Sequence, residues 1–109
     1  MKRILLFCSA GMSTSLLVTK MQKAAQEKGV DVVIDAFPEA EMAKHLDGAD
    51  VVLLGPQIRF ALARAKKTCG EKGIPVDVVN SMDYGMMDGE KVLNKALEMC
   101  ENSNGGVLK

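Results

Sequence analysis

Four short runs rich in β-branched residues recur along the chain, and most of them are continuous rather than alternating. Continuous apolar runs of this length are typical of strands that are covered on both faces in a parallel sheet. The pattern therefore predicts four strands, at residues 4–7, 32–37, 51–54 and 76–79.

Between these runs, apolar residues recur with the spacing of amphipathic helices. Long helices are predicted over residues 13–28, 57–68 and 89–99, and a shorter one around 39–46. Gly29 supplies a stop after the first of them. The apolar stripe of the helix over 13–28 consists of Leu17, Met21, Ala24 and Ala25. That of the helix over 57–68 consists of Ile58, Leu62 and Ala65, with Cys69 just beyond, and that of the helix over 89–99 consists of Val92, Leu93, Ala96 and Leu97, with Cys100 just beyond.

The alternation of strands and helices predicts an α/β fold. We expect a four-stranded parallel sheet with right-handed crossovers and helices on both faces. The length of 109 residues suits a single domain over residues 1–109, with a frayed tail from about residue 102. Ligands of such sheets bind beyond the carboxyl ends of the strands, where the strand order reverses, so the loop after strand one is the first candidate for an active loop.

Charge and composition exclude several function classes. Fourteen basic and fourteen acidic residues give zero net charge without a basic block, so we expect no nucleic-acid partner. The apolar runs are far shorter than a bilayer span, which favours a cytoplasmic location. Three widely spaced cysteines and the single His45 predict neither a disulfide framework nor a metal site. No cofactor is expected, and His45 is expected at the surface.

The strongest chemical signal lies in the loop after strand one, where Cys8 is followed by small residues that lead into a helix. Small residues let backbone N–H groups converge, and a helix N-terminus adds partial positive charge, so the loop can cradle an anion. The same field favours a nucleophilic thiolate. A buried cysteine followed by capping serines is the alternative. The expected phosphate-binding residues are Ser9, Ala10, Gly11, Met12, Ser13, Thr14 and Ser15.

The segment Leu-Phe-Cys-Ser-Ala-Gly-Met-Ser-Thr-Ser-Leu, which starts at Leu6, resembles the active-site segment of the lactose/cellobiose-type enzyme IIB components of the bacterial sugar phosphotransferase system. The likeness continues through Asp-Ala-Phe-Pro-Glu at 35–39 and Asp-Val-Val-Leu-Leu-Gly-Pro-Gln at 50–57. It ends with Tyr84-Gly85 and Asp-Gly at 88–89. These segments span nearly the whole chain.

The resemblance implies a phosphotransferase with a four-stranded parallel sheet, and we expect the protein to be monomeric. In that family the cysteine that matches Cys8 receives phosphate from a phosphohistidine on the IIA phosphocarrier. It then passes the phosphate to a sugar held by the membrane IIC permease. The implied sugar is a β-glucoside or a disaccharide such as cellobiose, chitobiose or lactose.

Two other functions use similar groups. Low-molecular-weight tyrosine phosphatases place a nucleophilic cysteine after strand one, in a Cys-x₅-Arg loop, and use an Asp-Pro acid. Here the sixth residue after Cys8 is Thr14, and no Asp-Pro occurs. Without these groups hydrolysis should be slow, as a carrier requires. The second alternative, a flavodoxin-like binding module that holds a ligand such as a nucleotide, lacks support from a Gly-x-Gly-x-x-Gly motif.

Further residues are expected at the same edge of the sheet. Gln57 follows strand three and, by the resemblance, borders the phosphate site, although Pro56 before it is also ordinary helix-start chemistry. Tyr84 follows strand four and is either a donor to phosphate, part of a partner surface, or a half-buried loop residue. A docking role is weighed against core filling for four methionines near these loops, Met12, Met82, Met86 and Met87.

Overall fold

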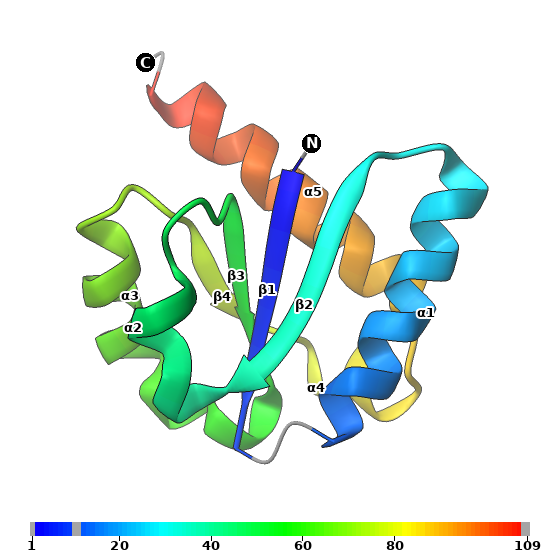
Figure 1. Ribbon diagram of the computed structural model, residues 1–109, viewed down its shortest axis with the longest axis horizontal. Helices are drawn as coiled ribbons and strands as arrows, with labels where there is room; N and C mark the ends of the chain where they lie inside the picture. The colour runs from blue at the N-terminus through cyan, green and yellow to red at the C-terminus, as the bar shows by residue number, and fades with distance from the viewer. Residues whose placement is uncertain (1, 10–11, 108–109) are drawn as a thin grey trace.

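The computed structural model describes residues 2–9 and 12–107, apart from the side chains of residues 12–14 and 102–107. Its centre is a four-stranded sheet in the order β2-β1-β3-β4, and every pair of neighbours is parallel (Figure 1). The predicted α/β fold and all four predicted strands are confirmed. The strands are β1 (Lys2–Cys8), β2 (Val32–Pro38), β3 (Val51–Leu54) and β4 (Val76–Val78).

Helices cover both faces of the sheet, as predicted (Figure 1). Side chains of β1 alternate between the two faces. Ile4 and Leu6 belong to a core shared with α1, α4 and α5, whereas Leu5 and Phe7 belong to a core shared with α2, η2 and α3. The helices are α1 (Met12–Lys28), η1 (Glu39–Glu41), α2 (Met42–His45), η2 (Pro56–Ala61), α3 (Leu62–Gly70), α4 (Ser81–Gly85) and α5 (Gly89–Val107).

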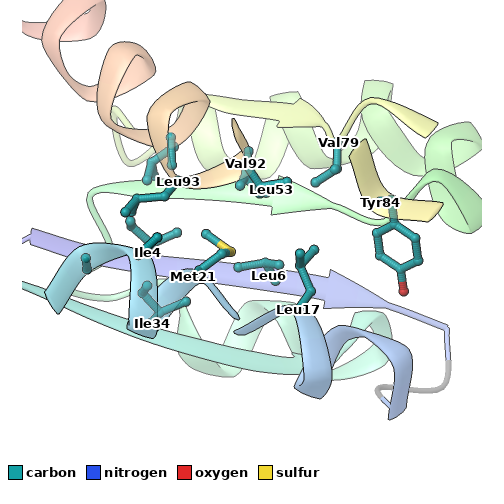
Figure 2. Packing of buried hydrophobic residues seen from close by; sticks show 14 of the residues in the cluster. Ile4, Leu6, Leu17, Met21, Ile34, Leu53, Val79, Tyr84, Val92 and Leu93 are labelled. Atoms are coloured by element: carbon teal, nitrogen blue, oxygen red, sulfur yellow. The ribbon is translucent and has the colours of Figure 1, made fainter. Parts of the chain in front are cut away.

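Complete burial on both faces explains why the central strands are continuous apolar runs. All four residues of β3 are buried, as are the last five of β1. Figure 2 shows Ile4, Leu6 and Leu53 packed together with Leu17 and Met21 of α1 and with Val92 and Leu93 of α5. The predicted stripes of α1 and α5 therefore form the core on this face.

Two elements after the strands differ from the predictions. The predicted helix over 57–68 begins as the 3₁₀ segment η2, because Ile58 has φ −117° and ψ 27°, and the α-helix starts only at Leu62. The short helix α4 was not predicted. The Oδ1 atom of Asn80 caps it by accepting from the N–H groups of Met82 at 2.8 Å and Asp83 at 3.3 Å.

Helix α5 continues to Val107, and the frayed tail expected from about residue 102 stays a prediction. Once a helix is nucleated by a packed segment, each added residue gains a backbone hydrogen bond, which allows poor helix formers to continue it. In the described part of the chain, no helix, α5 included, has the length and apolar character to span a bilayer.

His45 is more covered than the predicted surface position suggests. Its ring stacks on that of Phe37 with centroids 3.6 Å apart and an angle of 7° between the planes. Its Nε2 lies 3.2 Å from Oε1 of Glu41, one turn earlier. The aromatic stack therefore accounts for the partial burial of the imidazole.

Candidate functional site

Cys8 is the last residue of β1, a central strand of the sheet. The chain leaves β1 to form β2 on one side, and later forms β3 on the other side. The strand order thus reverses between β1 and β3, which is where open α/β sheets bind ligands. Cys8 is only 3% exposed and stands in register with Pro38 of β2. The structure therefore places this thiol at the switch point of the sheet.

The predicted phosphate-binding loop joins Cys8 directly to α1. Ser9 is exposed, Ala10 and Gly11 lie outside the described residues, and α1 begins at Met12. The backbone N–H groups of a first helical turn have no partners within the helix, and the first turn of α1 contains no acidic residue. The start of α1 is therefore suited to an anion. Of the other loop residues, Ser15 is exposed, whereas the side chains of Met12, Ser13 and Thr14 are not among those that the structure describes.

The corner after β3 lies beside Cys8, as the sequence predicted. The backbone N–H of Gly55 donates to the carbonyl of Phe7 at 2.8 Å, and the carbonyl of Leu54 accepts from Val79 at the same distance. A Cβ atom placed on Gly55 would lie 3.4 Å from the Cβ of Cys8. These bonds fix the ends of β1, β3 and β4 side by side. Gln57, two residues further on, is exposed.

Tyr84 lies in α4 rather than in a loop, and it is almost fully buried instead of half-buried. It packs in the core that contains Leu17 and Val79. In Figure 2 its ring lies beyond these two residues, at the end of the cluster toward which β1 runs. Since Cys8 has the same strand parity as Leu6, it belongs to this face of the sheet. Tyr84 is thus at the edge that the sequence predicted, and the structure places it on the same face of the sheet as Cys8.

Large apolar side chains are exposed on the elements that follow the strands. Two of them, Met82 at 71% and Met86 at 72%, belong to the predicted docking surface. Met87 is partly buried against the core and has a φ of 54°. Two residues were missed by the sequence reasoning, Leu16 of α1 at 51% and Phe60 of η2 at 75%. The signal was available, because both fall outside the apolar stripes of their helices.

The other two thiols are core residues, as predicted. Cys69 packs with Leu5 and Phe7, and Cys100 packs in the opposite core. Burial raises the pKa of the Cys69 thiol, and burial is also the largest cause of the raised pKa of Cys100. Both are therefore protonated at neutral pH and are poor nucleophiles. Among the described residues, no cluster of three His, Cys, Asp or Glu side chains is placed to hold a metal ion.

Comparison with known proteins points to one family. Residues 3–95 match the family described as PTS system, Lactose/Cellobiose specific IIB subunit. The galactose-specific EIIB component of Lactococcus lactis subsp. cremoris (strain MG1363) is 50% identical over 100 residues, which cover 87% of this chain and 93% of that protein. The oligo-beta-mannoside-specific EIIB component of Bacillus subtilis (strain 168) is 44% identical over 102 residues, covering 94% of this chain and 99% of the relative.

Two solved structures share the fold. The solution structure of the cellobiose-specific IIB component from Borrelia burgdorferi has a TM-score of 0.78 and 44% sequence identity, with 94% of each chain covered. The lactose-specific IIB domain from Streptococcus pneumoniae has a TM-score of 0.82, covering 90% of this chain and 96% of the other. With 20% identity, the second likeness concerns the fold alone.

Proposed function

Because the chain belongs to the lactose/cellobiose-specific IIB family of the sugar phosphotransferase system, we propose that Cys8 is the residue that carries the phosphoryl group. The observation that carries this proposal is the position of the thiol. Cys8 ends a central strand directly before the start of α1, whereas Cys69 and Cys100 are core residues with raised pKa values. Cys8 is the one cysteine at the carboxyl edge of the sheet.

The proposed reaction has two transfers. In the first, a lone pair on the Cys8 thiolate attacks the phosphorus of a phosphohistidine on a IIA protein. The S–P bond forms while the N–P bond breaks, and the electron pair of that bond returns to the imidazole nitrogen. In the second, a sugar hydroxyl forms an O–P bond while the S–P bond breaks, which restores the thiolate and releases the hydroxyl proton.

The start of α1 and the loop before it stabilise the charge on the transferring oxygens. A helix N-terminus contributes about 0.3–1 kcal/mol when exposed and up to ~2 kcal/mol when partly buried. Backbone N–H groups of the loop, residues Ser9 to Ser15, supply further donors. This assistance is electrostatic, so it serves the gain and the loss of the phosphoryl group equally.

A phosphatase is the second candidate, because its nucleophile occupies the same place after strand one. The sequence opposes it, since Thr14 stands where the phosphatase loop has arginine and no Asp-Pro acid is present. The phosphocysteine then lacks a group that activates water, and it persists until the next partner arrives.

The proposed partners are a IIA phosphodonor and a membrane IIC permease that holds the sugar. Relatives are named galactose-, oligo-beta-mannoside- and cellobiose-specific, and we assign this chain a β-glucoside or a disaccharide of the same general class. The exposed apolar side chains Leu16, Phe60, Met82 and Met86 are available for transient docking around Cys8. A cytoplasmic location is proposed on the grounds of this role.

The deciding experiment is intact-mass spectrometry after incubation with the general phosphotransferase proteins and a phosphorylated IIA component. Wild type should gain one phosphoryl group, and Cys8→Ser should gain none while remaining folded, because sulfur is exchanged for a poorer nucleophile of similar volume. Cys69→Ser is the control and should still accept phosphate. Phosphate on Cys8→Ser at wild-type yield would refute the assignment. Steady hydrolysis of aryl phosphates that depends on Cys8 would favour the phosphatase.

A further inference from the structure

The backbone beside Cys8 contains a hollow that a side chain would fill. Gly55 is buried, and a Cβ atom at this position would lie 3.4 Å from the Cβ of Cys8. It would also lie 2.7 Å from Oε1 of Gln57, which is closer than real Cβ contacts allow. The carboxamide of Gln57 therefore occupies part of the space that the missing side chain of Gly55 leaves open.

Strand parity places this hollow on the same face as Cys8. Phe7 stands in register with Leu54, so Cys8 and Gly55 are the next pair along β1 and β3. Val51 and Leu53 share a core with Leu6, and Gly55 continues their parity in an extended conformation with φ −63° and ψ 149°. The Oε1 end of Gln57 thus lies against Gly55 on the α1 side of the sheet, the face to which strand parity also assigns Cys8.

We propose that Gly55 is a positioning residue: because it lacks a side chain, it seats the Gln57 carboxamide beside Cys8, where this group donates a hydrogen bond to the phosphoryl group. The inference rests on the proposed role of Cys8. A carboxamide carries two N–H donors and an acceptor oxygen, and rotation about its terminal torsion exchanges the two ends within one seat. The acceptor end lies at Gly55 in this structure, and the donor end turns inward when an anion is present.

A neutral donor suits a carrier better than an arginine. A bidentate guanidinium binds phosphate strongly through charge-assisted hydrogen bonds. An amide donor orients the oxygens without adding a positive charge that the next acceptor must overcome. Gln57 thereby supplies a side-chain donor to the site in addition to the backbone N–H groups at the start of α1.

The fold tolerates the decisive substitutions. The backbone angles of Gly55 lie in a region that alanine adopts without strain. The atom closest to an added methyl group belongs to the flexible end of Gln57, which can swing away into solvent. Gly55→Ala should therefore remove the carboxamide from its seat while leaving β3 intact.

A double-mutant cycle tests the proposal. The rate of phosphoryl acceptance from a phosphorylated IIA component is measured under single-turnover conditions for wild type, Gly55→Ala, Gln57→Ala and the double variant. Loss of one hydrogen bond to a charged group predicts a drop of about 10- to 100-fold for each single variant. The double variant should be no slower than Gln57→Ala, because both changes remove the same contact. Gln26→Ala, an exposed glutamine on α1, is the control and should match wild type.

Three readouts separate the outcomes. Thermal unfolding shows that each variant is folded, and ³¹P NMR of the phosphorylated protein should give a shifted resonance in both single variants. A wild-type acceptance rate for Gln57→Ala overturns the proposal. Equal slowing by Gly55→Ala with and without Gln57 also overturns it, because Gly55 then acts on Cys8 directly. Failure of the proposed function is distinct, since Cys8→Ser would then retain phosphate.

Discussion

Gly89 is buried at the start of α5 against the backbone of α1, and its replacement by alanine gives a direct test of the packing. A Cβ atom on Gly89 would lie 2.4 Å from the carbonyl carbon of Lys20 and 2.6 Å from the backbone nitrogen of Met21. Both are backbone atoms in the middle of α1, so no side chain can rotate to relieve the clash. The helices must separate by about 1 Å to restore a contact of 3.4 Å.

The magnitude follows from two opposing effects. Overpacking of a core typically costs about 1–3 kcal/mol. Alanine recovers about 0.5–1 kcal/mol, because glycine loses more backbone entropy on folding. The difference between the two effects is a loss of up to about 2.5 kcal/mol with a midpoint near 1 kcal/mol, so Gly89→Ala should lower Tm by about 4–8 °C at the midpoint for a domain of this size.

Urea unfolding followed by circular dichroism measures this difference. Gly85→Ala is the matched control, because no atom lies within 4 Å of its added Cβ and the glycine is exposed at the end of α4. The control should be neutral or up to about 1 kcal/mol more stable. Equal stability of the two variants would show that α1 and α5 do not approach as closely as described.

Two further predictions concern stability. Asn80→Ala should cost about 1 kcal/mol in urea unfolding because it removes the cap of α4, and Asn80→Asp should retain most of that stability; equal losses would exclude capping. Because burial raises the pKa of the Cys69 thiol, its stabilising effect is present below the ordinary thiol pKa of about 8.5 and is lost as pH rises toward the folded value. Cys69→Ala should therefore flatten the decline in unfolding free energy between about pH 8 and 10, and an unchanged slope would contradict this.

The four strands could be predicted from the sequence, because short continuous apolar runs are typical of strands that are buried on both faces of a parallel sheet. The boundary at η2 was not predictable, since a 3₁₀ and an α-helical turn differ by one residue in hydrogen-bond spacing and Ile58 takes its conformation from packing. Helix α4 has only five residues, too few for an apolar period. Its one signal was Asn80, which is also typical of turns.

In the candidate site too, features that are local in sequence were predictable, whereas features that depend on the pairing of distant strands were not. Cys8 and the helix after it are local in sequence, so their placement at the end of strand one was predictable, whereas the chemistry assigned to them stays a proposal. The hollow at Gly55 depends on the register of β1 against β3, which joins residues 47 positions apart and has no local signature. The exposure of Phe60 was missed for a different reason: its position outside the apolar stripe was visible in the sequence, but an aromatic residue is usually assigned to the core.

The strand that ends in Cys8 is expected, with β3, to be among the last parts of the protein to open. β1 is hydrogen-bonded to neighbours on both sides and is buried under both cores, so its amides become accessible only through global unfolding. The exposed side chains Met82, Met86 and Phe60 belong instead to short segments that can fluctuate locally. A surface of this kind can adapt to partners of different shape while the sulfur keeps a fixed position in space.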